Sequence, residues 1–148
     1  MAAVKDILSR KGRDVVTMVA DDSVLTAARL MNSRGIGGVI VVEDDEVIGV
    51  FTERDVLRRV VAERLDPANA VIRDVMTTPV FTCKPDAKLE ECVALITSKK
   101  IRHIPVVDDS GLCGVVTSGD ILAYQMEEQA DTIQHLHNYV FDVRPVAP

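Results

Sequence analysis

The stretch IGGVIVVEDDEVIGVFTERD, residues 36–55, decides the fold because a second copy, IRHIPVVDDSGLCGVVTSGD, follows at residues 101–120. The two copies align without a gap at an offset of 65 residues, and eight of the twenty aligned pairs are identical. Unrelated segments of ordinary composition would share about one or two. The chain therefore contains an internal duplication, and we expect its fold to consist of two similar units.

The duplication extends toward the N-terminus beyond the quoted stretch. Thr17 aligns with Thr82 at the same offset, and the segment VKDIL at 4–8 resembles IRDVM at 72–76 at an offset of 68. One repeat of about 60 residues would bury too little surface to be stable by itself, so we expect the two to pack together. These matches predict a first repeat at 4–64, a linker at 65–71, a second repeat at 72–124 and a C-terminal helix at 125–141.

The spacing of apolar residues predicts a strand and then a helix in each repeat. Residues 15–19 form a short β-rich run, and residues 80–83 are the corresponding run of the second repeat. In the first repeat we expect Ser23 to cap a helix whose apolar residues follow at helical spacing. Gly35 is expected to end that helix in a left-handed conformation.

A hairpin and a second helix are expected to complete each unit. Residues 39–42 and 47–51 are rich in β-branched side chains and flank an acidic turn, and a helix is expected to begin near Thr52. The strands are apolar almost throughout, which indicates burial on both faces. We therefore predict an α/β (α+β) fold of tandem βαββα repeats that pack sheet to sheet, with an additional C-terminal helix.

The C-terminal segment carries one apolar stripe. Its members are separated by threes, fours and sevens, as one face of a helix requires. This stripe is expected to pack on the rest of the chain or to form a dimer contact. It consists of Leu122, Met126, Ile133, Leu136 and Val140.

Composition and charge argue against several functional classes. The 148 residues carry a net charge of −6, which gives no support to nucleic-acid binding. No apolar run approaches the roughly 20 residues that span a bilayer, and no signal-peptide pattern is present, so we expect a cytoplasmic protein without membrane contact. His135 and His137 are two residues apart and would point away from each other on a helix. We expect no enzymatic activity, no metal site and no required cofactor.

Both repeats carry the motif Gly-Val-x-Thr-x-x-Asp, at 49–55 and at 114–120. One interpretation is structural, because a Thr followed three residues later by an acid at a strand-to-helix junction resembles a capping box. The other is functional: the helix N-terminus and the Thr hydroxyl suit a phosphate, and the Asp can accept hydrogen bonds from a ribose. In the functional interpretation the glycine lets the ligand approach the strand backbone. Both interpretations hold if the Thr and Asp cap the helix when no ligand is bound.

The doubled motif, the strand IRHIPVV at 101–107 and the segment DVMT at 74–77 resemble a cystathionine-beta-synthase (CBS) domain pair. The similarity covers the chain from about Val4 to about Tyr124. It implies a pseudo-twofold arrangement with two clefts, which commonly dimerises through its helices and binds AMP, ADP, ATP, NAD or S-adenosylmethionine. In such pairs the Thr and Asp of one repeat hold phosphate and ribose, and basic residues of the other repeat reach the phosphates.

Carried over to this sequence, the resemblance gives the first cleft a strong positive charge. Thr52, Arg54 and Asp55 of the first repeat are expected to face Arg102 and His103 of the second. Cations of this kind can neutralise two or three phosphates, and arginine binds them bidentately. The first cleft is therefore expected to prefer charged nucleotides.

The second cleft differs on its partner side. Thr117, Ser118 and Asp120 are expected to line it, but the opposite strand offers Gly37 and Gly38 where the first cleft has Arg and His. This difference removes the phosphate clamp. We expect the second cleft to bind more weakly, or to take a ligand with less concentrated charge.

The resemblance also suggests where the adenine lies. Thr17 and Thr82, on the first strand of each repeat, are expected to border the adenine pocket. Val80 and Ile104 are expected to form its apolar walls, and Pro105 is also expected to contact the nucleotide.

Together these expectations define a function. We predict a non-catalytic regulatory module, a homodimer, that binds an adenosine-type nucleotide and signals its occupancy to an unidentified protein partner. The alternative is a constitutive oligomerisation or protein-interaction module whose clefts are vestigial. The Thr and Asp present in both repeats favour ligand binding.

Overall fold

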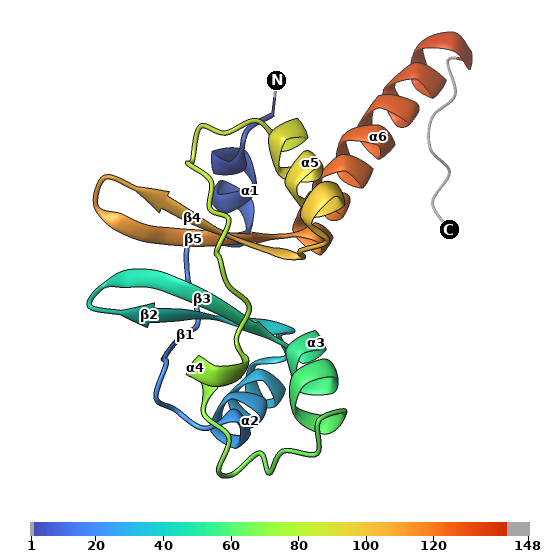
Figure 1. Cartoon of the computed structure of the whole chain (residues 1–148). Coiled ribbons are helices and arrows are strands. Elements are labelled where there is room, and N and C mark those ends of the chain that lie inside the picture. The colour runs from blue at the N-terminus through green and yellow to red at the C-terminus, as the bar shows by residue number, and fades with distance from the viewer. Residues whose placement is uncertain (1, 142–148) are drawn as a thin grey trace.

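Two small sheets lie face to face and are covered on their outer sides by helices (Figure 1). The structure, a computed structural model, describes the backbone of residues 2–141 and the side chains of residues 2–137. The elements are α1 (Val4–Lys11), β1 (Thr17–Val19), α2 (Val24–Arg34), β2 (Gly38–Glu43), β3 (Glu46–Thr52), α3 (Glu53–Asp55), η1 (Val56–Val61), α4 (Ile72–Val75), α5 (Leu89–Lys99), β4 (His103–Asp108), β5 (Gly111–Thr117) and α6 (Ser118–Phe141).

Each sheet is built around the hairpin that the repeat predicts. In the first repeat β1 runs parallel to β2, which pairs antiparallel with β3, and in the second β4 pairs antiparallel with β5. The acidic turn of the first hairpin places Asp44 and Asp45 at φ values of 50° and 63°. Two consecutive positive φ angles are typical of the tight turns that match the twist of a two-stranded hairpin. The α/β fold with two similar units is therefore confirmed.

The predicted helix signals of the first repeat are confirmed. The Ser23 hydroxyl accepts a hydrogen bond from the Thr26 N–H at 3.1 Å, and Gly35 ends α2 in the left-handed region at φ 62°. The helix expected after Thr52 also forms, but only its first turn is α-helical, since Val56–Val61 form a π-helix. Such helices are rare and are often found at functional sites.

The prediction of a strand at residues 80–83 is wrong. Only Cys83 forms a bridge there, to Val106, where the first repeat has the full strand β1. The physical reason is a proline in the neighbouring strand. In the first repeat, Ile40 of β2 donates its N–H to the Val16 carbonyl. The residue equivalent to Ile40 in the second repeat is Pro105, which has no N–H to donate. The parallel ladder of the second repeat is shortened accordingly.

The first helix of each repeat packs on the core of the other repeat. In α1, Val4 donates its N–H to the Ala87 carbonyl, and its side chain and that of Leu8 are buried in the cluster around Ile104. Conversely, Ile72 and Val75 of α4 are buried in the first repeat's cluster. Figure 1 shows α1 beside β5 and α4 beside α2. The repeats are thus tied together by an exchange of segments, a connection that the alignment does not reveal.

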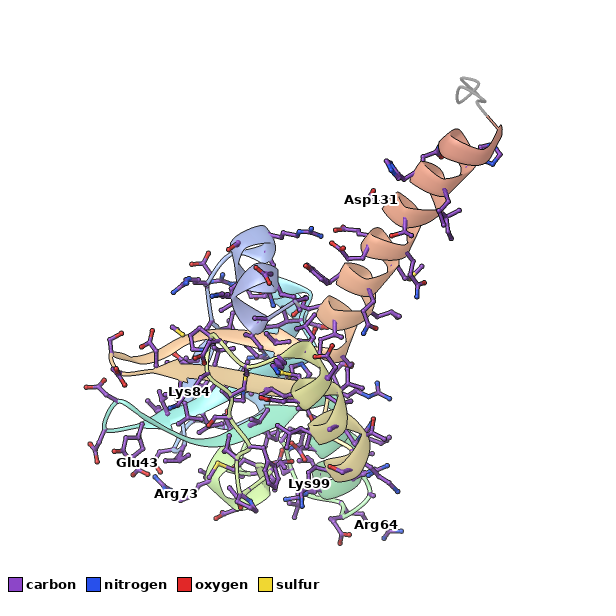
Figure 2. The ribbon with its side chains drawn as sticks, turned by 90° about the horizontal axis from the view of Figure 1, so that it is seen from above. Glu43, Arg64, Arg73, Lys84, Lys99 and Asp131 are labelled. Atoms are coloured by element: carbon purple, nitrogen blue, oxygen red, sulfur yellow. The ribbon has the colours of Figure 1, made fainter. Side chains whose placement is uncertain are left out.

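The second helix of the second repeat and the C-terminal helix are one continuous helix, α6. It runs from Ser118 to Phe141 and extends beyond the body of the molecule, where Asp131 lies (Figures 1 and 2). Its apolar stripe does not pack on the rest of the chain, because Ile133 is 67% exposed and Leu136 is 55% exposed. The side chain of Val140 lies outside the described residues. Within residues 2–141 no helix combines the length and apolar character that a membrane span requires.

Candidate functional site

Two cavities lie between the repeats, and each contains one of the two motif carboxylates. The cavity at Asp55, here the Asp55 cavity, has a volume of about 930 Å³. The cavity at Asp120, here the Asp120 cavity, has a volume of about 500 Å³. Both volumes are in the range of small-molecule sites. In both cavities the Thr and Asp of one repeat face residues of the other.

The Asp55 cavity brings together the residues that the sequence predicted for it. Thr52, Arg54 and Asp55 line it together with Arg102 and His103, and Val80 also lines it. Additional cations come from η1 and from the end of α5. The six Lys and Arg residues around the cavity are Arg54, Arg58, Arg59, Lys99, Lys100 and Arg102.

The Asp55 carboxylate is buried and has partners on both oxygens. The Thr52 N–H donates to Oδ2 at 3.0 Å, which completes a capping box, and the Thr77 hydroxyl donates to Oδ1 at 2.8 Å. The Arg59 guanidinium lies 3.6 Å from Oδ1. Thr77 reaches this position because its backbone pairs with Val50 of β3. A ribose hydroxyl must therefore share Oδ1 with Thr77 and Arg59, or replace one of them, in order to bind Asp55.

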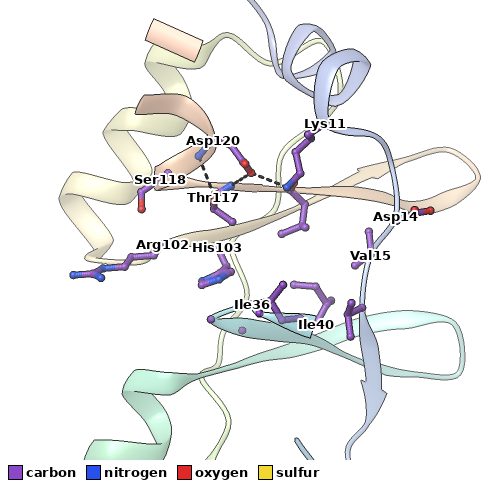
Figure 3. A pocket seen from close by; sticks show the side chains of 16 residues that line it. Lys11, Asp14, Val15, Ile36, Ile40, Arg102, His103, Thr117, Ser118 and Asp120 are labelled. Atoms are coloured by element: carbon purple, nitrogen blue, oxygen red, sulfur yellow. Dashed lines mark hydrogen bonds and ion pairs between the residues drawn. The ribbon is translucent and has the colours of Figure 1, made fainter. Parts of the chain in front are cut away.

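The Asp120 carboxylate has partners on one oxygen only (Figure 3). Oδ2 accepts from the Thr117 N–H at 2.9 Å and from the Lys11 ammonium at 2.7 Å. Within the described part of the chain, no side chain or backbone group donates to Oδ1. A carboxylate oxygen has room for two hydrogen bonds. Asp120 can therefore accept a ribose hydroxyl without losing its cap.

Lys11 is a site residue that sequence reasoning missed. It lies at the end of α1, and the exchange of helices brings it beside β5, where its ammonium also donates to the Val115 carbonyl at 3.0 Å. No motif marks it, because the segment containing α1 aligns at a different offset from the rest of the repeat. The Asp120 cavity therefore contains a cation in addition to Arg102, although one that is already paired with Asp120. The expectation that this cavity lacks the basic residues of the first cleft is wrong, because Arg102 and His103 line it as well.

His103 lies between the two cavities and lines both. A Cβ atom placed on Gly38 would be only 3.0 Å from the His103 ring, so Gly38 makes the space that the imidazole fills. Gly38 and His103 occupy the same position in the two repeats, and they meet where the sheets face each other. Burial lowers the pKa of His103, and Lys11 adds to this effect. Its Nδ1 atom is buried and has no hydrogen-bond partner among the described residues.

The motif glycines have a different role from the one expected. A Cβ on Gly49 would overlap the Met76 sulfur, and a Cβ on Gly114 would lie 2.8 Å from a methyl group of Leu8. Both contacts are below any normal van der Waals distance. The glycines therefore let the exchanged segments pack on the hairpins, and the expectation that they admit a ligand is wrong.

Four predicted residues lie outside both cavity linings. Thr17 and Thr82 are exposed, and Val15 and Val80, two positions earlier, are the residues that line the cavities. Ile104 is fully buried in the second repeat's core because adjacent residues of a strand point to opposite faces. Pro105 is buried as well. The remaining predicted residues line one cavity or both.

The geometry suits an anionic ligand with hydroxyl groups. Positive charge surrounds the Asp55 cavity, and each cavity offers a carboxylate beside the start of a helix. Within the described residues, no three His, Cys, Asp or Glu side chains cluster as the ligands of a metal ion would.

The fold and the paired sites define a CBS-type module, and comparison with known proteins agrees. The CBS domain family model matches the chain twice, at residues 4–62 and 72–127. These segments cover most of the sequence. The chain belongs to the CBS domain family.

Relatives of this chain include a CBS domain-containing protein that it matches along most of both lengths. It is 31% identical to the CBS domain-containing protein YhcV of Bacillus subtilis, over 88% of this chain and 90% of that one. It is also 43% identical over 112 residues to the uncharacterized protein MK0525 of Methanopyrus kandleri. That match covers 74% of this chain and 57% of the relative.

One solved neighbour has adenosine ligands. The CBS domain pair of protein MJ0100 is 25% identical, with a TM-score of 0.76 over 86% of this chain and 98% of that one. It was solved in complex with 5-methylthioadenosine and S-adenosyl-L-methionine. A CBS domain pair of the same fold therefore binds adenosine compounds.

Proposed function

We propose that this protein is a non-catalytic regulatory module that binds adenosine-type ligands in the two cavities between its repeats. The observation that carries the proposal is the pairing of each cavity with a Thr and an Asp at a helix start. The adenosine ligands of the MJ0100 neighbour support it. Occupancy of the cavities would be signalled to a protein partner.

The two cavities are suited to different ligands. The Asp55 cavity has six surrounding cations but a carboxylate whose oxygens are both engaged. We assign it nucleotides with concentrated charge, such as AMP, ADP, ATP or NAD. The Asp120 cavity has a free carboxylate oxygen, and of its two cations Lys11 is paired and Arg102 is shared with the Asp55 cavity. We assign it adenosine compounds with less charge.

Self-association through the helices is part of the proposal. Leu57 and Val61 are more than half exposed, and so are their equivalents Leu122 and Met126 at the offset of 65. A contiguous exposed apolar surface is typical of an interaction site. We propose that this face and the stripe on α6 form a homodimer contact.

Calorimetry of the full chain tests ligand binding. AMP, ADP, ATP, NAD and S-adenosylmethionine are titrated into the wild type, and we expect ATP to bind at sub-millimolar concentration. Arg58→Gln removes a cation that lines only the Asp55 cavity, and it should weaken ATP about tenfold, as expected for one charged hydrogen bond of about 1.5 kcal/mol. The same variant should leave adenosine nearly unaffected.

A matched variant controls for net charge. Lys5→Gln also removes one positive charge, from an exposed position on α1 that lines neither cavity. It should leave ATP affinity unchanged. If no ligand binds wild type, ligand sensing is wrong, and a constitutive interaction module is the better description. The exposed apolar helix face favours that second function, and sedimentation measurements would then show a stable oligomer.

A further inference from the structure

The two cavities are adjacent and share part of their walls. Gly37, Arg102, His103 and Ser118 line both. Positions 37 and 102 are equivalent in the two repeats, so the shared wall lies where the repeats meet. A group on this wall can act in either cavity.

Arg102 is the shared residue with a permanent charge. Its side chain is exposed, and within the described residues its guanidinium makes no hydrogen bond or ion pair. His103 is not a substitute, because burial lowers its pKa and favours the neutral form. In Figure 3 the Arg102 side chain points away from Lys11 and Asp120. Because the Arg102 guanidinium has no partner among the described residues, a ligand phosphate in either cavity can attract it.

The two cavities depend on Arg102 to different degrees. The Asp55 cavity has five other Lys and Arg residues, whereas the Asp120 cavity has only Lys11 in addition. Lys11 is held by Asp120 and by the Val115 carbonyl, so its charge is already balanced. A phosphate in the Asp120 cavity consequently relies on Arg102 for its uncompensated positive charge.

On the basis of the ligand binding proposed above, we propose that the two cavities compete for the Arg102 guanidinium. A phosphorylated ligand in the Asp55 cavity draws Arg102 toward itself and adds negative charge near the shared wall. Both effects weaken a phosphorylated ligand in the Asp120 cavity, and thermodynamic reciprocity requires the reverse as well. A ligand without phosphate is unaffected. The protein would therefore hold one phosphorylated and one uncharged adenosine ligand more readily than two phosphorylated ones.

Amide NMR of the full chain can follow each cavity separately. Gly119 lines only the Asp120 cavity, and Val80 lines only the Asp55 cavity. AMP and adenosine are titrated into wild type and into Val80→Trp, whose larger side chain obstructs the Asp55 cavity. At the Gly119 amide, AMP should bind about fivefold or more tightly in Val80→Trp than in wild type. Adenosine should bind equally to both proteins.

Arg102→Gln supplies the second variant, in case Val80→Trp fails to fold. In this variant the coupling between the AMP curves at Val80 and Gly119 should be clearly weaker than in wild type, because only the repulsion between the two phosphates remains, whereas Lys99→Gln, which alters only the Asp55 cavity, should keep the full coupling. Equal AMP affinity at Gly119 in wild type and Val80→Trp would overturn the competition. So would coupling that is as strong in Arg102→Gln as in wild type, or that is equally strong for adenosine. If neither amide responds to any ligand, the proposed function itself is wrong, and the competition with it.

Discussion

Asp55 and Asp120 occupy the same place in two copies of one motif, yet their surroundings differ. Both carboxylates accept the N–H of the Thr three residues earlier. Asp55 is then held by Thr77 and Arg59 and is only 5% exposed, whereas Asp120 pairs with Lys11 and keeps one oxygen free. The local motif thus fixes the cap in both repeats. The difference comes from residues outside the motif, among which the exchange of α1 and α4 brings Lys11 and Thr77 to the two sites.

The largest expected effect is a loss of stability when a side chain of an exchanged helix is truncated. Leu8 is fully buried against β5 of the second repeat, so Leu8→Ala should lower the free energy of unfolding by about 3–5 kcal/mol. Met76, its counterpart, is only half-buried, and Met76→Ala should cost less. Urea unfolding measures both.

Amide hydrogen–deuterium exchange shows which strands each of these two substitutions destabilises. In Leu8→Ala the amides of β4 and β5 should lose protection first, although Leu8 belongs to the first repeat by sequence. In Met76→Ala the amides of β2 and β3 should be affected instead. Loss of protection in the substituted residue's own repeat would contradict the exchange.

The two carboxylates should respond unequally to neutralisation. Asp55→Asn places an amide NH₂ opposite a donor inside a buried network, and we expect a loss of about 1.5–3 kcal/mol in unfolding free energy. Asp120→Asn can turn its NH₂ toward the free side and loses mainly the partly exposed Lys11 pair, about 0.2–1 kcal/mol. Thermal or urea unfolding at neutral pH provides the values. Equal losses would show that the second partners of the two carboxylates do not matter.

His103, between the two cavities, should give the smallest effect. Lys11 and Arg102 oppose its protonation, and Asp120 and Glu53 favour it, but burial dominates and lowers its pKa from 6.5. A lowered histidine pKa means that the unfolded chain binds the proton more readily. The stability that His103 contributes is therefore complete above about pH 6.5 and is lost as pH falls toward the folded-state pKa.

Variants of two histidines isolate this contribution. Unfolding free energy measured between pH 7.5 and 5 should fall less in His103→Gln than in wild type. His135→Gln, at an exposed position on α6, should keep the wild-type slope. A His103→Gln profile parallel to that of wild type would contradict the assignment.

Much of the fold could be predicted because the relevant signals are local. Ser23, Gly35 and the Thr52–Asp55 capping box depend on residues within a few positions of one another, and all formed as expected. The missing strand at 80–83 depends on Pro105, a residue some twenty positions away on the neighbouring strand. The absence of this strand could be predicted only if its pairing with the strand that contains Pro105 were already known.

The candidate site was less predictable because its second partners come from distant segments. Thr77 and Lys11 have no motif of their own and reach the carboxylates through the exchange of helices. The role of the motif glycines could not be predicted for the same reason, since their neighbours Met76 and Leu8 belong to those exchanged segments. An alignment of the repeats shows which residues are equivalent. It does not show which residues touch.

A crystal structure of the full chain grown with AMP tests the central claim most directly. We predict AMP in the Asp55 cavity, its phosphate beside the surrounding arginines and lysines, and its ribose bonded to the Asp55 carboxylate in place of the Thr77 hydroxyl. If saturating AMP leaves this cavity without nucleotide and Asp55 still bonded to Thr52 and Thr77, the carboxylate is a structural cap and the account of ligand sensing is contradicted.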